Sequence, residues 1–424
     1  MNFIQKHIKP ILSDKKPDYL LLILSCSLFI IGMIFSYSLS IFTVDYFDYG
    51  QFHFLLRQAF IGVFAIAIMF FFAHIRPEVL LEQYKIGWLL FGVFMLLMAV
   101  MPFLPSFMVT QSGGANRWIR LPGFSLSPVE FFKIGFIYFL AFSFHRKFTN
   151  LHKISFKQEV KMLLPYAVVF SIVVFLIAFL QKDLGQVVLL GTVLFVMLIF
   201  ANRSAKIFMT IISTAIFGVI TLIISAPHRI NRFQSWWSSV QDSILAIFPS
   251  DIANSLRVED FPEPYQVSNS LNAMYHGGWF GVDLSNGALK LGFLSEVHTD
   301  FVLAGITEEI GLIGLFFIIT LFFIVIMRIL RISRRLVNAQ YHLFTLGIAI
   351  MLFIAFIINA YGVSGIIPIK GIAVPFLSYG GSGILSLGIA IGLVLSISTQ
   401  MITDEELKNQ TTEDEKEKVN IVES

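Results

Sequence analysis

Long apolar stretches alternate with short polar connections along the chain, a pattern that predicts a membrane protein built from helices. Ten runs have about the 20 apolar residues that a helix needs to cross a bilayer core. Because lipid offers the backbone no hydrogen-bond partners, each run is predicted to be a helix. The expected fold is thus an all-α polytopic membrane protein of about ten transmembrane helices. The predicted spans are Tyr19–Phe42, Phe54–Phe72, Ile86–Leu104, Val129–Phe144, Met162–Leu180, Leu184–Ala201, Ile207–Ser225, Phe301–Leu330, His342–Tyr361 and Ser378–Ile397.

Basic residues in the connections indicate which side of the membrane each connection faces. With a cytoplasmic N-terminus, most of the 30 Lys and Arg residues lie in cytoplasmic segments, while the opposite loop Thr43–Gln51 is acidic and has none. An even number of spans then makes the C-terminus cytoplasmic as well. We expect a cytoplasmic tail at 1–18, a single transmembrane domain at 19–399, and a charged, disordered cytoplasmic tail at 400–424.

Composition agrees with this interpretation. Hydrophobic residues make up 56% of the 424 residues and charged residues 13%, the latter about half of the usual soluble share. These values argue against a soluble enzyme, a disordered protein or a nucleic-acid binder. The single cysteine, Cys26, excludes an intrachain disulfide and a Cys-cluster metal site. The first apolar run is too long for the h-region of a cleavable signal peptide.

Polar chemistry is concentrated on the predicted outer face. The largest loop, at 226–300 between spans seven and eight, is far longer than ordinary connections, which suggests a function. No P-loop or nucleotide-binding glycine motif is present, so nucleotide-driven chemistry is not expected.

Within this loop, the aromatic pattern around Trp236 and Trp237 has helical spacing, which predicts an amphipathic helix in the membrane interface. Its role is either anchoring or contact with a lipid-borne substrate. Arg229 and Arg232 precede it and bind either phosphate or lipid head groups.

The first polar cluster joins residues 113–119 to the start of the fourth span. Pro128 suits a helix start, and Glu130 and Lys133 are three residues apart, so they can pair on one helix face. A capped helix with an interfacial ion pair accounts for the pattern. Alternatively, Arg117 and Lys133 meet an anionic head group.

Two tight outer turns form further candidate sites. In residues 181–186, Asp183 either caps the following helix or contacts substrate or an ion. The loop at 365–382 is rich in Pro and Gly, which predicts a re-entrant segment at the helix mouth. In it, Lys370 either neutralises a pyrophosphate or extends its amine to the interface.

The strongest cluster runs from Tyr265-Gln266 to Glu309. Charged side chains inside a span are costly and indicate function. Eight helical residues advance by about 12 Å and about 80°, so Asp300 and Glu308 are predicted to face one cavity at different depths. For Glu309, the alternative is a neutral carboxyl that is hydrogen-bonded to another helix.

Six ordered blocks within residues 113–385 resemble the SEDS family of bacterial membrane proteins (shape, elongation, division and sporulation). The sequence departs from the usual family pattern at Lys182, Gln186 and Gly383. Each motif keeps its charged residues, so the departures put in doubt only the fine contacts with substrate. The blocks are Arg117-Trp118-Ile119; Pro128 with Glu130 and Lys133; Gln181 with Asp183-Leu184-Gly185; Tyr265-Gln266; His298-Thr299-Asp300-Phe301 with Glu308-Glu309-Ile310-Gly311; and the run from Pro375 to Ser382.

The resemblance implies a GT-C-like fold and a peptidoglycan glycosyltransferase. Such proteins polymerise lipid II, a disaccharide-pentapeptide on undecaprenyl pyrophosphate, on the outer face of the bacterial cytoplasmic (inner) membrane. The implied partners are a class B penicillin-binding protein and other division proteins, with no nucleic acid. The family's catalytic aspartate falls on Asp300, and Glu308 and Trp118 fall on positions that the family uses in its central cavity. Lys370 resembles the division branch more than the elongation branch, so a septal role is expected.

The residues suggest compatible chemistry. A sugar hydroxyl as acceptor needs a general base, for which Asp300 is the candidate. The resemblance implies Glu308 as the second catalytic residue. A divalent cation, Mg²⁺ or Mn²⁺, is compatible with Asp300, but no ligand constellation establishes it. The cations expected to stabilise a leaving pyrophosphate are Arg117, Lys133, Arg229 and Lys370. The other predicted substrate-binding residues are Trp118, Glu130, Asp183, Gln266, His298, Ser378 and Tyr379.

Other classes of function make different predictions. A lipid II flippase would need polar residues along both halves of the membrane, whereas the motifs here cluster outside. A non-enzymatic scaffold for the transpeptidase would not need a carboxylate at 300. A secondary transporter is disfavoured by the large outer loop and the absence of paired broken helices.

Overall fold

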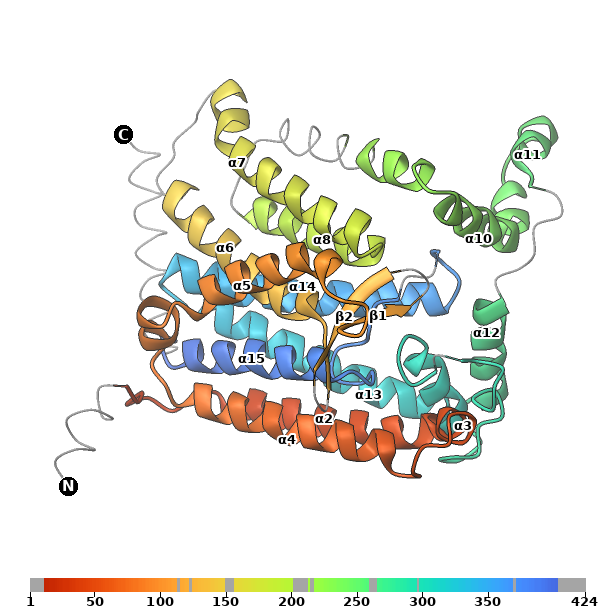
Figure 1. Ribbon diagram of the computed structural model, residues 1–424, viewed down its shortest axis with the longest axis horizontal. Coiled ribbons are helices and arrows are strands. Elements are labelled where there is room, and N and C mark those ends of the chain that lie inside the picture. The colour runs from red at the N-terminus through yellow and green to blue at the C-terminus, as the bar shows by residue number, and fades with distance from the viewer. Residues whose placement is uncertain are drawn as a thin grey trace, which may run out of the picture.

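Helices dominate the computed structural model, which describes residues 11–112, 115–121, 124–148, 156–200, 213, 217–258, 265–295, 297–368 and 371–402 (Figure 1). The α-helices are α2 (Tyr19–Leu39), α3 (Ile41–Tyr46), α4 (His53–Ala73), α5 (Ile86–Val100), α6 (Pro128–Phe148), α7 (Phe156–Val174), α8 (Leu184–Phe200), α10 (Pro227–Leu245), α11 (Ser250–Leu256), α12 (Tyr265–Gly277), α13 (Val302–Arg334), α14 (Ala339–Val363) and α15 (Gly381–Ser398). The π-helices are η1 (Val79–Gln83) and η3 (Phe175–Leu180), and η2 (Met101–Phe103) is a 3₁₀ turn. The strands are β1 (Val109–Ser112), β2 (Ala115–Leu121) and β3 (Phe124–Leu126).

The predicted apolar runs are helical over most of the residues that the structure describes, although the run Ser378–Ile397 becomes helical only at Gly381. Within the described residues, seven helices are long and apolar enough to cross a membrane: Tyr19–Leu39, His53–Ala73, Val79–Phe103, Lys157–Leu180, Val302–Arg334, Ala339–Val363 and Gly381–Ser398. In addition, α8 is apolar but shorter, and α6 carries Glu130 and Lys133 in its first turns. About half of the predicted run Ile207–Ser225 lies outside the described residues, and its residues 217–224 are helical.

The centre of the bundle is formed by α14 and α15. Their apolar windows are 72% and 78% buried, whereas no other candidate span exceeds 39%. Beside them, α6 is buried along most of its length and packs on α5 and α14. A Cβ on Gly135 would overlap the backbone of Phe91, so α5 and α6 approach as closely as small residues allow. Exposed side chains on the outer helices, such as Phe60 and Phe71, are apolar, which suits a surface that faces lipid.

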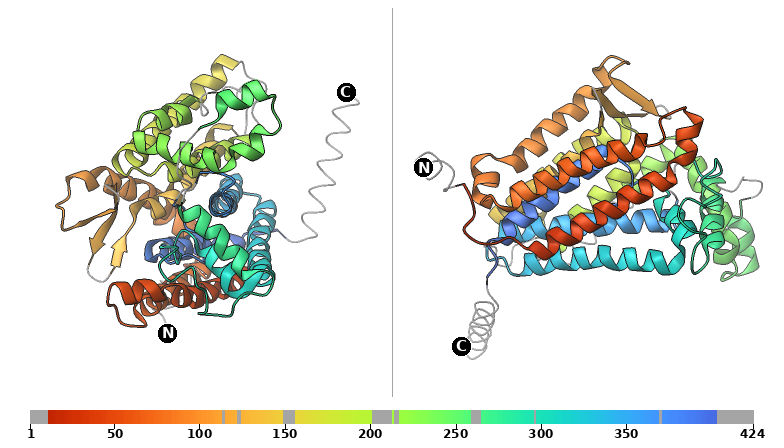
Figure 2. Two further views of the ribbon diagram at one scale, coloured as in Figure 1. Left: turned by 90° about the vertical axis from the view of Figure 1, so that its right-hand side faces the viewer. Right: turned by 90° about the horizontal axis from the view of Figure 1, so that it is seen from below.

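A three-stranded antiparallel sheet fills the outer loop before α6 and departs from the all-α prediction. The strand order is β1-β2-β3, and the sheet projects from the side of the bundle (Figure 2). Thr110 pairs with Trp118 and Gln111 with Asn116, which makes Arg117 the extra residue of a bulge. Bulges re-aim side chains next to functional sites. Strands of three to seven residues are too short for the apolar-run criterion to detect.

Helix α13 is interrupted at Gly311, whose φ of 71° and ψ of 177° are not helical. The turn after α12 fills this break, because Leu312 N donates to Gly278 O, Ile313 N to Trp279 O, and Val282 N to Glu308 O. Backbone groups that a broken helix leaves free need such partners. The segment that follows α12 is therefore packed onto α13 rather than projecting as a loose loop.

Both described ends of the chain lie at the same end of the bundle. Near the N-terminus, Arg76 N donates to Ile11 O, and near the C-terminus, Ile402 N donates to Arg335 O. Asp18 joins the two, since it binds Arg328 at 2.8 Å and its backbone N–H donates to Ser398 Oγ. Helices α10, α11 and α12 gather at the opposite end (Figure 1), as expected for the large outer loop.

Candidate active site

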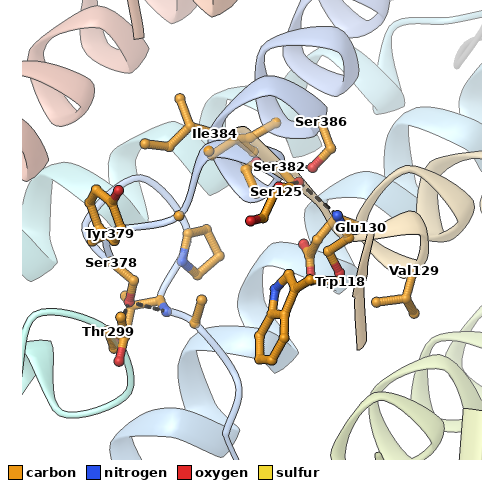
Figure 3. Close-up of a pocket in the computed structure, with 18 of the residues that line it drawn as sticks. Trp118, Ser125, Val129, Glu130, Thr299, Ser378, Tyr379, Ser382, Ile384 and Ser386 are labelled. Carbon is orange, nitrogen blue, oxygen red and sulfur yellow. Dashed lines mark hydrogen bonds between the residues drawn. The ribbon is translucent and has the colours of Figure 1, made fainter. Parts of the chain in front are cut away.

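A cavity of about 590 Å³ lies where α4, α6, α14 and α15 meet the sheet and the segment that precedes α15. Figure 3 shows Thr299, Ser378 and Tyr379 on one wall and Trp118 and Glu130 on the other, with residues of α15 between them. The predicted site residues that line it are Arg117, Trp118, Glu130, Lys133, Asp183, Asp300, Ser378 and Tyr379. Residues more than 180 positions apart in the sequence thus meet at one site.

The backbone around Asp300 is held at three successive carbonyl groups. Tyr379 N donates to His298 O at 2.8 Å, and Ser378 Oγ donates to Thr299 O at 2.7 Å. The third bond runs from Asn359 Nδ2 to Asp300 O, also at 2.7 Å. Asp300 precedes the first residue of α13, so the start of that helix fixes its other side. Such restraint holds a catalytic carboxylate near one position.

Space for this carboxylate is provided by Gly371. A Cβ on Gly371 would lie 2.8 Å from Asp300 Oδ2, closer than real Cβ atoms come to an oxygen. The absence of a side chain at 371 therefore lets the carboxylate lie against the backbone of the cavity wall.

Cations occupy the opposite wall, each beside a carboxylate. Lys133 Nζ is 2.8 Å from Glu130 Oε2, which confirms the predicted pairing on α6. Arg117 Nη2 donates to Lys182 O at 3.0 Å, and Arg117 Nε lies 3.6 Å from Asp183 Oδ2. The turn between η3 and α8 thus directs the guanidinium toward the cavity.

Asp183 caps α8, as one of its two interpretations predicts, because its Oδ1 accepts from Gln186 N at 3.3 Å. Burial raises the pKa of this carboxyl above its ordinary value, and Arg117 opposes the shift. Gln186 links the two ion pairs, since its Nε2 also donates to Glu130 Oε1 at 3.4 Å.

Three predicted site residues do not line the cavity. His298 lies directly behind it, with its ring centroid 5.1 Å from that of Phe54. Gln266 donates from Nε2 to Ser295 Oγ at 3.2 Å in the outer segment. Glu308 is the third. A fourth candidate, Lys370, lies outside the described residues.

The prediction that Glu308 shares a cavity with Asp300 is wrong. Glu308 is fully buried, and its Oε1 accepts from Ala288 N at 2.7 Å, Leu289 N at 3.0 Å and His276 Nδ1 at 3.0 Å. The segment after α12 folds back over α13, so this carboxylate meets loop backbone instead of the cavity. Glu308 therefore anchors the outer segment.

Glu309 is hydrogen-bonded to another helix, as one interpretation predicts, and it also faces a lysine. Its Oε1 lies 2.6 Å from Lys290 Nζ, and both carboxylate oxygens accept from Ser38 Oγ. Lys290 is 1% exposed and also donates to Ser38 O at 3.0 Å. This contact ties the outer segment to α2 and α13 together.

Arg229 has a structural role in place of the predicted anion contact. Its guanidinium donates to Leu222 O and Ala178 O, each at 2.7 Å, and burial lowers its pKa. The amphipathic helix predicted after it is present as α10, where Trp236 Nε1 donates to Gly365 O at 2.9 Å.

Several cavity residues escaped the sequence analysis. Arg57, His53 and Tyr49 line the cavity from the start of α4 and the turn before it. Arg57 bonds the Tyr379 hydroxyl and lowers its pKa, although burial raises that pKa more strongly. A basic residue inside an apolar run is itself a functional signal, so Arg57 could have been found by the reasoning that selected Glu308.

A metal site made from protein groups alone does not fit the described residues. They contain no group of three or more His, Cys, Asp or Glu side chains arranged to hold an ion. Of the cavity carboxylates, Glu130 and Asp183 already face Lys133 and Arg117. A divalent cation at Asp300 would depend largely on oxygen ligands from a substrate.

The long apolar helices and the buried central pair define a multi-pass membrane protein with a polar cavity between its helices. A family model described as a cell cycle protein, for FtsW, RodA and SpoVE, matches residues 18–402. The chain therefore belongs to the FtsW/RodA/SpoVE family, the SEDS family of the sequence resemblance.

Individual relatives agree with this assignment. The probable peptidoglycan glycosyltransferase FtsW of Helicobacter pylori is 46% identical over 372 residues, which cover 88% of this chain and 95% of that protein. Stage V sporulation protein E of Bacillus subtilis is 33% identical over 384 residues, or 90% and 97% of the two chains.

Solved structures show the same fold. The rod shape determining protein RodA of Thermus thermophilus superposes with a TM-score of 0.61 at 19% identity, covering 92% of this chain and 98% of that one. A chain from a peptidoglycan synthase complex, described for its coordination of polymerization and crosslinking, gives 0.66 at 19% identity, with 90% and 97% covered.

Proposed function

We propose that this protein is a peptidoglycan glycosyltransferase that polymerises lipid II at the outer face of the cytoplasmic membrane. The observation that carries the proposal is the position of Asp300. Three carbonyl contacts hold its segment in place, and it lies in one cavity with the cations Arg117 and Lys133. Names of the relatives support the same activity, since the FtsW proteins among them are described as probable peptidoglycan glycosyltransferases.

In this mechanism, the Asp300 carboxylate accepts the proton of the acceptor sugar hydroxyl. The hydroxyl oxygen forms a bond to the anomeric carbon of the donor as the bond from that carbon to the pyrophosphate oxygen breaks. The leaving group departs as polyprenyl pyrophosphate with the bonding electron pair. Arg117, Lys133 and Arg57 stabilise its charge.

The side chains around these groups suit a lipid-linked sugar. Trp118 offers an aromatic face to a sugar ring, and Ser125, Ser127 and Ser382 lie nearby on the cavity wall. Deeper lining residues, among them Met351, Leu352 and Leu387, are apolar. This distribution favours chemistry at the outer end over the flippase alternative, which needs polar groups through the full membrane depth.

We further propose a septal role beside a class B penicillin-binding protein that crosslinks the glycan, with other division proteins as additional partners. The support is the 46% identity to an FtsW protein and the relation to a chain from a peptidoglycan synthase complex. An elongation role of the RodA kind is the alternative, and Lys370 remains a prediction for the division branch. If a divalent cation takes part, Asp300 is its candidate protein ligand.

The test is lipid II polymerisation by the purified protein with its class B partner, comparing wild type with Asp300→Asn. Loss of a general base costs about 100-fold or more in rate, so the variant should make no glycan ladder. Asp283→Asn is the matched control, because it makes the same chemical change at an exposed outer position with a φ of 74°, which Asn tolerates. Wild-type polymerisation by Asp300→Asn would refute the base assignment. If neither protein made glycan, a flipping assay in liposomes would test the alternative.

A further inference from the structure

Asn359 of α14 lies directly behind Asp300 and belongs to none of the motifs in the sequence. Its side chain is 2% exposed and does not line the cavity. Nδ2 donates to Asp300 O at 2.7 Å and to Ile372 O at 2.8 Å. Both protons of the amide are therefore used on two carbonyl groups from segments that are far apart in the sequence.

The orientation of this amide is fixed by its partners. Two carbonyl oxygens require two donors, so the NH₂ group must face them, and a flipped amide would place Oδ1 against both. Oδ1 has no hydrogen-bond partner within the part of the chain that the structure describes. Buried polar atoms are usually hydrogen-bonded, so an unpaired Oδ1 is unusual. The amide leaves this acceptor unpaired while it donates to two carbonyl groups, which indicates that its role is to bridge them.

Ser378 forms a second bridge of the same kind. Its Oγ donates to Thr299 O at 2.7 Å and accepts from Val374 N at 2.8 Å. Thus two side chains, Asn359 and Ser378, join backbone at 299–300 to backbone at 372–374. The first segment carries the catalytic carboxylate, and the second forms the wall on which it rests.

That wall begins at Gly371, the neighbour of Ile372. Because a Cβ on Gly371 would lie 2.8 Å from Asp300 Oδ2, a small shift of this segment would press on the carboxylate or withdraw from it. Asn359 thus restrains both the backbone of Asp300 and the surface against which its carboxylate lies.

We propose that Asn359 is a positioning residue for the general base, an inference that rests on the proposed function of Asp300. Asn359 contacts neither substrate nor the reacting atoms. It keeps the Asp300 carboxylate within hydrogen-bond reach of the acceptor hydroxyl, so it acts on the rate of the chemical step and not on substrate affinity. A misplacement of about 1 Å in such a group can cost about 100-fold.

The experiment compares Asn359→Leu, which keeps the branched shape at Cγ and has no donor, with Asn359→Ser, which is smaller and keeps one donor. Thr345→Val is the matched control, because Thr345 is a fully buried hydroxyl of the same helix that has no hydrogen-bond partner among the described residues. Initial rates of lipid II polymerisation are measured against lipid II concentration and pH, with the class B partner present. Binding to that partner and monodispersity in detergent verify the fold.

We expect kcat to fall about 100-fold in Asn359→Leu and less in Asn359→Ser, with KM unchanged in both. The acidic limb of the pH profile for kcat/KM reports the base of the free enzyme. It should be displaced in the Asn359 variants and unchanged in Thr345→Val. If Asn359→Leu does not fold, the kcat and pH profile of Asn359→Ser, compared with those of Thr345→Val, test the inference.

Two results would overturn the inference while leaving the proposed function intact. The first is that Asn359→Ser and Asn359→Leu both keep the kcat and the pH profile of the wild type while Asp300→Asn is inactive. The other is a raised KM with unchanged kcat, which would make Asn359 a determinant of binding. Full activity of Asp300→Asn would instead refute the general base itself.

Discussion

At the residue scale, the cavity cations are arranged before any substrate arrives. Lys133 is held by Glu130 on its own helix, a contact that sequence spacing predicts because residues three apart share a helix face. Arg117 meets Asp183 across 66 positions of sequence. That second pair could not be predicted, because it depends on a bulge in a short strand and on where the sheet packs.

The buried carboxyl of Asp183 leads to a prediction about pH. Its pKa is raised by burial in the folded state, so the folded state holds this proton more tightly than the unfolded state does. Binding of this proton contributes to the stability of the folded state. That contribution is fully present below the ordinary aspartate pKa, about 3.9, and is lost as the pH rises through the raised pKa of the folded state. Asp183→Asn keeps a good helix N-cap and has no such proton.

The melting temperature of Asp183→Asn relative to wild type should therefore rise as the pH increases above about 4. Thermal unfolding in detergent at a series of pH values measures this difference. The control is Asp283→Asn, which makes the same chemical change at an exposed position. A difference for Asp183→Asn that stays constant with pH would show that Arg117 fully compensates the burial.

At the element scale, two consecutive glutamates of α13 attach the segment after α12 to the bundle. Sequence reasoning correctly selected Glu308 and Glu309 as unusual, since charges inside an apolar run are costly. It assigned Glu308 to the cavity by counting 300–308 as one helix, whereas Asp300 precedes the N-cap Phe301 and the segment after α12 covers Glu308. The apolar pattern does not predict the break at Gly311 or the folded-back segment. It indicates which residues face lipid, but not which backbone groups form hydrogen bonds with one another.

The pair Lys290–Glu309 should behave as a buried ion pair. Glu309→Gln leaves the Lys290 amine at 1% exposure without its counter-charge, which is expected to cost about 3–5 kcal/mol of unfolding free energy. The double variant Lys290→Met with Glu309→Gln removes both charges and should recover most of that loss. A double-mutant cycle on chemical unfolding in detergent gives the coupling energy.

The prediction would be contradicted if the free-energy change of the double variant equalled the sum of the two single changes, because that result is expected for independent sites. The exposed pair of Arg257 and Asp242, 3.0 Å apart, provides the comparison. Its removal should change stability by only about 0–1 kcal/mol.

At the scale of the whole molecule, the helical character of the described apolar runs follows closely from the sequence, while the site follows only in part. Lipid imposes one rule on every span, so apolar runs such as Tyr19–Phe42 translate directly into helices such as α2. The cavity instead depends on contacts between distant segments. Asp300, Arg117 and Lys133 were found through their motifs, and Arg57 could have been found as a charge inside an apolar run. Asn359 lies in an apolar helix where sequence alone gives it no neighbours.

The contacts at the Asp18 end also make a topological prediction that can be measured. Residues near both described termini join the connection after α4 and the connection between α13 and α14, and this end carries Arg76, Arg328, Arg331 and Arg334. Basic connections remain in the cytoplasm. The opposite end, with α10 and the cavity, must then face outward, where a lipid-linked sugar would be available.

Because Cys26 is the only cysteine, a Cys26→Ala background allows single-site labelling. Ser239→Cys on α10 and Gln400→Cys after α15 both place a thiol at an exposed position, at opposite ends of the molecule. A membrane-impermeant maleimide should label Ser239→Cys in intact spheroplasts and Gln400→Cys only after permeabilisation, while the Cys26→Ala parent stays unlabelled. Labelling of Gln400→Cys in intact spheroplasts would reverse the orientation and place the cavity in the cytoplasm, where the proposed polymerisation of outer-leaflet lipid II could not occur.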